Sequence, residues 1–239
     1  LVAAMFTPVQ FAAFSIAATL APVMLMARKS VGLVLMPGMS RAEGRGDLQA
    51  MLKANQQGNL VVTAFMSPLL AVVAVFADVL VGWVYTSQYI EAANVLRVFV
   101  ALWLLQMIDF NALVVILKEG AFLSRVNAPL VLLAAACSYL GATVWGLPGA
   151  ALGGVIATYV ERMLLARRLA SRLGTTLYAI QPWGRTAGMS VTALLLCATY
   201  RWIADSMSWP PVWSMILAGG ISGALGLLLA RRLLKGVVL

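Results

Sequence analysis

The sequence predicts an all-α integral membrane protein with about seven transmembrane helices. Apolar residues make up 62% of its 239 residues, and the mean hydropathy is +0.94. Charged residues make up only 10%, well below the roughly 25% that is usual in soluble domains. Because about 20 apolar residues cross the hydrocarbon core of a bilayer as a helix, the apolar stretches define seven candidate spans: Phe11–Ala27, Leu60–Ala77, Val98–Leu117, Pro129–Trp145, Gly149–Tyr159, Thr186–Ile203 and Val212–Ala230.

The fifth span is the shortest of these stretches, and it reaches spanning length only if its helix continues through Glu161 to Leu165. The segment Gly146–Gly149 alone separates it from the fourth span. Glycine and proline in such a short segment favour a tight reversal of the chain. The fourth and fifth spans are therefore predicted to form a helical hairpin.

The distribution of basic residues orients the spans. Of the 17 Lys and Arg residues, 15 lie in gaps on one alternating side, and only Arg97 and Arg201 lie on the other. Lys and Arg accumulate on the cytoplasmic side of membrane proteins, so we expect Leu1 to start outside and the C-terminus to be cytoplasmic, in the cell inner membrane. This topology and anionic lipid headgroups account for the formal net charge of +9. The sequence has no basic–aromatic module, and no nucleic-acid partner is expected.

The composition also limits the chemistry of the chain. It contains no histidine, which removes the usual acid–base group at neutral pH and the commonest metal ligand. Both cysteines, Cys137 and Cys197, lie within apolar spans, where they behave as small hydrophobic residues. The outer gaps are short and nearly free of acid–base residues. We therefore expect no metal, no cofactor and no enzymatic activity; a membrane-embedded polysaccharide polymerase or ligase is the less favoured alternative.

Arg28 and Lys29 are the first candidate binding residues. They follow a 17-residue apolar span and precede seven largely apolar residues, so a helix that ends at Pro37 places both in the inner half of the bilayer. A charge at mid-membrane costs at least about 2.5 kcal/mol on insertion scales, and such a cation usually faces a wet cavity or a partner. The alternative is that both side chains reach the cytoplasmic headgroups. Adjacent helical residues point about 100° apart, so one can face inward while the other is interfacial.

Asp109 is the only carboxylate near the middle of a predicted span, and Gln106 shares its face in a continuous helix. Asn111 points to the opposite side of such a helix. Two interpretations are open: a cavity-lining carboxylate that pairs with a basic residue or a coupling ion, and a structural hydrogen bond between helices. The predicted substrate-binding set is therefore Arg28, Lys29, Gln106 and Asp109.

Two further charged pairs are predicted to be structural. Arg201 and Asp205 are four residues apart near the outer end of the sixth span, and this spacing favours an interfacial ion pair on one helical face. Glu161 and Arg162 follow the apolar part of the fifth span and are interpreted as markers of the inner membrane interface.

Three stretches, in this order, resemble motifs of the polysaccharide-biosynthesis flippases in the multidrug/oligosaccharidyl-lipid/polysaccharide superfamily. The stretch Val34–Arg41, followed by Gly46-Asp47-Leu48, is similar to the family's LPxLS and GD junction, where a helix meets a cytosolic loop. Phe76–Val98 resembles the outer loop of these proteins, and Trp145–Ala151 resembles their hairpin between two later helices. The resemblance covers about Phe11 to Tyr159.

This resemblance implies a fold and a function. Family members have two six-helix lobes around a central cavity, and many add two C-terminal helices. Residues 1–180 are accordingly expected to form a C-terminal lobe with five spans, and residues 181–239 two additional transmembrane helices. The chain is then the C-terminal part of a longer protein, with its N-terminal lobe and membrane lipid as partners. The implied function is a flippase that moves a lipid-linked oligosaccharide or polysaccharide precursor across the cytoplasmic membrane; an ion-coupled multidrug exporter of the same fold is the alternative.

Overall fold

The computed structural model describes residues 2–19 and 21–235. Within these residues every regular element is a helix. The elements in chain order are α1 (Val2–Met5), α2 (Pro8–Ala18), α3 (Ala21–Gly44), α4 (Leu48–Val75), α5 (Ala77–Val84), a short 3-10 helix η1 (Ser87–Tyr89), α6 (Ala92–Gln106), α7 (Asn111–Ile116), α8 (Gly120–Arg172), α9 (Trp183–Ser206) and α10 (Pro211–Lys235).

The described residues contain five helices that are long and apolar enough to cross a membrane: Pro8–Gly44, which contains α2 and α3, then α4, α8, α9 and Pro211–Leu233 of α10. An all-helical protein with several candidate membrane spans is thus confirmed, although the structure has five such helices where the sequence predicts seven. The difference has two sources. The fourth and fifth predicted spans lie within the 53 residues of α8. α6 is 15 residues long, about 23 Å at 1.5 Å per residue, which is shorter than the hydrocarbon core of about 30 Å.

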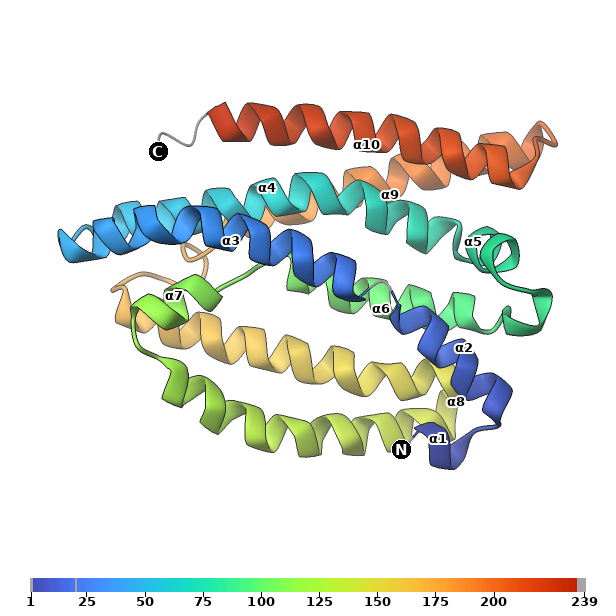
Figure 1. Cartoon of the computed structure of the whole chain (residues 1–239), viewed down its shortest axis with the longest axis horizontal. Helices are drawn as coiled ribbons and strands as arrows, with labels where there is room; N and C mark the ends of the chain where they lie inside the picture. The colour runs from blue at the N-terminus through green and yellow to red at the C-terminus, as the bar shows by residue number, and fades with distance from the viewer. Residues whose placement is uncertain (1, 20, 236–239) are drawn as a thin grey trace.

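The long helices run along the longest axis of the molecule (Figure 1). In this view α10 lies on one side, α3, α4 and much of α9 overlap in the middle, and the two arms of α8 lie on the opposite side. α4 packs against α3, α9 and α10, while α6 packs against α8. Of the apolar core of α4, 72% is buried inside the protein, against 17% to 28% for the other four candidate spans. α4 is therefore the central helix, and the others surround it.

Two apolar cores hold these helices together. The first includes Leu70 of α4 and Trp103 of α6, and the second includes Met51 of α4, Phe110 and Leu165. The outward faces of the surrounding helices are also apolar. Large side chains are exposed there, among them Leu132 of α8, Trp202 of α9 and Leu228 of α10. Extended apolar surface of this kind fits contact with lipid.

α8 consists of two arms that meet at Gly146, where φ is 64° and ψ is −140°. Residues with a Cβ atom rarely adopt a positive φ, so glycine suits this reversal. Beyond the reversal the two backbones touch. A Cβ atom on Gly149 would collide with the carbonyl oxygen of Gly141, and one on Gly153 would collide with that of Ala134. The predicted hairpin between the fourth and fifth spans is confirmed.

Two predicted boundaries are wrong. α3 does not end at Pro37 but continues to Gly44, because proline removes only one backbone donor while Met39 and Ala42 pack into the second core. The predicted third span is interrupted, since α6 ends at Gln106 and α7 begins at Asn111. Asp109 therefore lies in a loop between two helices and not on a helical face.

Candidate functional site

A cluster of charged side chains forms where three elements meet. Arg28 extends from α3, Arg162 from the second arm of α8, and Asp109 from the loop between α6 and α7. Nε of Arg28 lies 3.6 Å from Oδ2 of Asp109, and Nη1 of Arg162 lies 3.8 Å from Oδ1. The three side chains are 11%, 8% and 15% exposed, respectively. The cluster is therefore largely buried among apolar helices.

The break between α6 and α7 positions Asp109. In a hydrocarbon environment backbone groups need partners within the protein, so an interrupted helix requires side chains to supply them. The N–H of Asp109 donates to Oδ1 of Asn59 on α4 at 3.0 Å, and Oδ1 of Asp109 accepts the N–H of Asn111 at 3.0 Å. Nη1 of Arg28 donates to the carbonyl oxygen of Gln106 at 3.5 Å. Side chains thus satisfy three of the backbone groups at the break.

The three ion-paired side chains carry an excess of positive charge, since two arginines face one carboxylate; the neighbouring Glu161 also acts electrostatically on Arg162. Both arginine–carboxylate distances exceed the usual N–H···O hydrogen-bond length of about 2.7–3.2 Å. Within the described part of the chain, Nε of Arg28 and both Nε and Nη1 of Arg162 are buried without a hydrogen-bond partner. An unsatisfied buried donor costs roughly 1–3 kcal/mol, and more when it is charged. The site therefore favours a further anionic group with several acceptor oxygens.

Two asparagines of α4 extend this polar region. Asn55 and Asn59 are both buried and lie one helical turn apart. Nδ2 of Asn59 donates to Oε1 of Gln181 at 3.0 Å, and Nε2 of Gln181 donates to the hydroxyl of Thr186 at 3.1 Å. This buried chain links α4 to the start of α9. Nδ2 of Asn55 meets no acceptor among the described residues, so it adds another unpaired donor beside the cluster.

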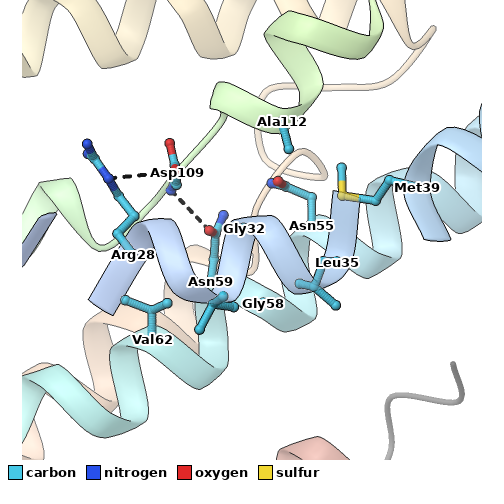
Figure 2. A pocket seen from close by; sticks show the side chains of 11 residues that line it. Arg28, Gly32, Leu35, Met39, Asn55, Gly58, Asn59, Val62, Asp109 and Ala112 are labelled. Atoms are coloured by element: carbon cyan, nitrogen blue, oxygen red, sulfur yellow. Dashed lines mark hydrogen bonds and ion pairs between the residues drawn. The ribbon is translucent and has the colours of Figure 1, made fainter. Parts of the chain in front are cut away.

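A small cavity adjoins the cluster, and Figure 2 shows Arg28 and Asp109 side by side, joined by a dashed line, among the residues that line it. Its volume of about 20 Å³ accommodates one water molecule. Direct packing of α3 on α4 limits its size, because a Cβ atom on Gly58 would collide with Cδ1 of Leu35. The space beside the charged cluster is therefore small.

The structure brings together only part of the binding set that the sequence predicts. Arg28 and Asp109 lie together, and Gln106 joins them through its backbone carbonyl. Lys29 is exposed and does not line the cavity. Of the adjacent basic pair, one residue thus lies inside the fold and the other on its surface.

Sequence reasoning omits Arg162, Asn55 and Asn59. Arg162 is only 6% exposed as a whole residue, so it lies inside the protein, and its interpretation as a marker of the inner membrane interface stays a prediction. Arg162 lies ten residues before the end of α8 at Arg172, about 15 Å along the helix. The length of this helix was therefore the sequence signal that Arg162 lies away from the helix end. No feature of the sequence indicates the role of Asn59, because its contact with Asp109 arises from tertiary packing alone.

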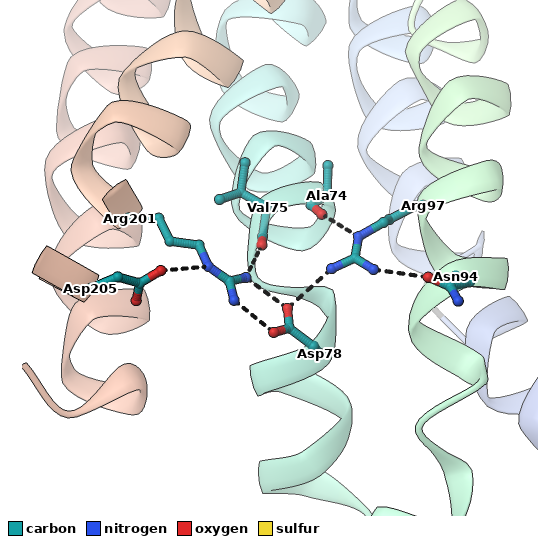
Figure 3. Close-up of polar contacts among 7 residues, drawn as sticks. All are labelled: Ala74, Val75, Asp78, Asn94, Arg97, Arg201 and Asp205. Atoms are coloured by element: carbon teal, nitrogen blue, oxygen red, sulfur yellow. Dashed lines mark hydrogen bonds and ion pairs between the residues drawn. The ribbon is translucent and has the colours of Figure 1, made fainter. Parts of the chain in front are cut away.

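A second ion-pair cluster joins α5, α6 and α9 (Figure 3). Both oxygens of Asp78 accept hydrogen bonds from Arg201 at 2.7 Å, and Oδ1 accepts another from Arg97 at 3.1 Å. The predicted pair of Arg201 and Asp205 is also present, at 3.5 Å, but Asp78 is the closer partner. Hydrogen bonding to Arg201 is the main cause that lowers the pKa of Asp78.

This second cluster fastens three elements together. The side chains of Asp78 and Arg97 are 36% and 41% exposed, and each charged group has a close partner of opposite sign. Such a satisfied arrangement has little capacity to hold a ligand, and we interpret it as structural.

The described residues contain no group of three or more His, Cys, Asp or Glu side chains that could hold a metal ion. The fold and the site define an all-helical protein with several candidate membrane spans and a buried, net-positive cluster between them. Comparison with family models, curated proteins and solved structures finds no match to this chain.

Proposed function

We propose that this chain belongs to a flippase of the cytoplasmic membrane, which moves a lipid-linked oligosaccharide or polysaccharide precursor between leaflets. The observation that carries the proposal is the buried cluster of Arg28, Arg162 and Asp109, in which guanidinium donors lack acceptors. The sequence resemblance to polysaccharide-biosynthesis flippases supplies the class of substrate. No catalytic step is assigned to the chain.

The charge of the cluster supports a phosphate-bearing substrate. A guanidinium group offers parallel N–H donors that bind two phosphate oxygens at once. The resemblance implies a lipid carrier joined to its sugar through a diphosphate, which has acceptor oxygens for both Arg28 and Arg162. Because an unpaired charge within a bilayer is costly, two arginines beside one carboxylate are better explained by an anion that visits them than by packing alone.

Transport in this proposal requires the cavity to open. A volume of about 20 Å³ excludes a diphosphate, so in this proposal the substrate enters only when the cavity is wider than it is in this structure. Arg28 lies on α3, and Arg162 lies on α8. Movement of α3 away from α4 would widen the cavity and separate Arg28 from Asp109, leaving the arginine available to the substrate.

The organisation of the chain is part of the same proposal. Residues 1–180 form a C-terminal lobe, residues 181–239 add two helices, and an N-terminal lobe of the same transporter completes the cavity. The five candidate helices correspond to seven spans when the two arms of α8 are counted separately and the segment of α6 and α7 is counted as a further span. The basic ends of the helices face the cytoplasm, and the C-terminus is cytoplasmic.

A multidrug exporter coupled to a cation is the second candidate, because Asp109 is a carboxylate buried between helices. The flanking arginines argue against it. Arg28 and Arg162 lie 3.6 Å and 3.8 Å from Asp109. Both would repel a coupling cation that approaches the same carboxylate. We therefore favour the anionic substrate.

The proposal is tested by reconstituting the intact protein in liposomes that contain a fluorescent oligosaccharide linked to a lipid through a diphosphate. A membrane-impermeant quencher added outside reports the movement of this substrate between leaflets. We expect movement with the wild-type protein and its loss in the double variant Arg28→Gln, Arg162→Gln at equal amounts of folded protein. Lys29→Gln is the matched control, because Lys29 is the adjacent exposed cation, and it should behave like the wild type.

Wild-type movement in the double variant would overturn the anionic site. Failure of the wild-type protein to move the lipid-linked sugar, together with gradient-driven export of a cationic dye that depends on Asp109, would favour the exporter.

A further inference from the structure

The two arms of α8 form a wedge that is closed at one end and open at the other. At the closed end the backbones touch, because Gly141, Gly149 and Gly153 carry no side chains. Farther from the reversal, a cavity of about 520 Å³ lies between the arms. Its lining includes Phe122, Arg125, Pro129 and Leu130 of the first arm and Leu164 and Arg168 of the second.

The open end of the wedge is strongly basic. Residues 118–125 and 165–172 contain five basic residues and one acidic residue, Glu119. Glu119 pairs with Arg168 at 2.9 Å and also with Arg172. The hydrogen bond from Arg168, followed by that from Arg172, lowers the pKa of Glu119 against the opposing effect of burial. Glu119 thus anchors both arginine side chains while leaving the region with a net positive charge.

Two arginines border the apolar cavity in a defined geometry. The guanidinium of Arg168 lies 5.3 Å from the ring centre of Phe122, a cation–π contact that orients it. Arg125 is exposed, and its Nε donates to the carbonyl oxygen of Ala121, one turn back on the same helix. A phosphate at the open end can therefore reach two guanidinium groups directly above an apolar interior.

We propose that this wedge binds one anionic glycerophospholipid, whose acyl chain enters the cavity and whose phosphate contacts Arg125 and Arg168. The cavity volume lies within the range of about 300–1,000 Å³ that is usual for ligand pockets. From Phe122 to Leu130 the first arm extends about 12 Å, less than half of the hydrocarbon core of about 30 Å, so the site belongs to a single leaflet. It shares no lining residue with the cavity beside Arg28 and Asp109 and goes beyond the proposed function.

Lipid titrations followed by native mass spectrometry test this site in the purified, delipidated intact protein. Phosphatidylglycerol and phosphatidylcholine with identical acyl chains differ in net charge but share the phosphate. We expect tighter binding of phosphatidylglycerol, and about a fivefold loss of its affinity in Arg125→Gln, the change expected when one arginine near an anionic headgroup is removed. Arg45→Gln, which removes an exposed arginine outside the wedge, is the matched control and should bind both lipids as the wild type does.

A second variant tests the apolar part of the site. Leu164→Trp enlarges a side chain that lines the cavity and should weaken the binding of both lipids. If the tryptophan variant does not fold, Leu164→Phe is used in its place. Equal affinity of the wild type for the two lipids, or unchanged phosphatidylglycerol binding in Arg125→Gln, would overturn the proposal. Movement of the lipid-linked sugar is measured in the same variants, so failure of the lipid site is distinguished from failure of the transport site at Arg28.

Discussion

The backbone N–H of Asp109 donates to the side-chain oxygen of Asn59 at 3.0 Å, although the two residues are 50 positions apart in the chain. This contact attaches the loop between α6 and α7 to the central helix α4. The same asparagine donates to Gln181, so one buried side chain connects the loop with the start of α9. Asn59 therefore holds Asp109 at the position where Arg28 and Arg162 meet it.

Asn59→Leu is expected to destabilise the protein by roughly 2–4 kcal/mol, because the N–H of Asp109 and the side-chain oxygen of Gln181 both lose their buried partner. Thermal unfolding in detergent measures the change. Gln49→Leu is the matched control on the same helix, since Gln49 is exposed, and it should change stability by less than about 0.5 kcal/mol. Equal unfolding temperatures for the two variants would show that Asn59 does not hold the loop.

Arg162→Met is expected to abolish transport while leaving the unfolding temperature unchanged or raising it. Arg162 is buried with two unpaired nitrogen donors and lies beside another cation, and a hydrophobic replacement of a poorly satisfied buried charge is often neutral or stabilising. Arg201→Met provides the contrast, because Arg201 makes two hydrogen bonds of 2.7 Å to Asp78 and its loss should lower stability. A large loss of stability in Arg162→Met would indicate a structural residue and not a substrate-binding one.

Alanine substitutions at two glycines of the α8 hairpin are expected to change stability in different directions. Gly149→Ala introduces a Cβ atom that collides with the backbone of Gly141 and should destabilise by about 1–3 kcal/mol through overpacking. A Cβ atom on Gly154 meets only Cδ1 of Leu102, at an ordinary 3.7 Å. Because alanine favours a helix over glycine by up to about 1 kcal/mol, Gly154→Ala should be neutral or stabilising. Thermal unfolding of the two variants reports whether the arms pack this closely.

Acid is expected to weaken the cluster around Asp78. Its pKa is lowered in the folded protein from an ordinary value of 3.8, mainly by hydrogen bonding to Arg201. The stabilisation is therefore complete above that ordinary value and is lost as the pH falls through the lower folded-state pKa. Asp78→Asn should reduce stability near neutral pH, and the difference from wild type should narrow below pH 3.8.

The effect of Asp78 should be modest, because its side chain is 36% exposed and water screens exposed ion pairs. Asp205→Asn is the control: Asp205 is 61% exposed, and within the described part of the chain its side chain forms one ion pair, of 3.5 Å with Arg201, so it should change the pH profile less. Parallel unfolding curves for wild type and Asp78→Asn at all pH values would contradict this account.

The orientation is tested with single cysteines in a background that lacks Cys137 and Cys197. A maleimide that cannot cross membranes should label Gln88→Cys in intact cells and should label Ser171→Cys only after the membrane is opened. Both positions are exposed, and they lie on opposite sides of the membrane if the basic gaps face the cytoplasm. The reverse pattern would place the basic helix ends outside.

The sequence by itself determined those features that depend on local composition. Long apolar stretches predicted helices, because helices satisfy their own backbone hydrogen bonds in lipid. The glycine and proline residues between Gly146 and Gly149 predicted the hairpin for a similarly local reason. Asp109 was identified as a buried carboxylate because it is the only acidic residue near the middle of an apolar stretch.

Only the tertiary structure decided which charged residues meet. Hydropathy does not specify how a helix is rotated about its axis or which neighbour it packs against, so it could not separate buried Arg28 from exposed Lys29. The end of α6 at Gln106 likewise depends on partners from elsewhere, since Asn59 and Arg28 satisfy backbone groups at the break. Arg162 joins the cluster because the second arm of α8 continues to Arg172 and packs beside α6. Composition defines the apolar helices, whereas their mutual packing brings the few buried polar groups close enough to interact.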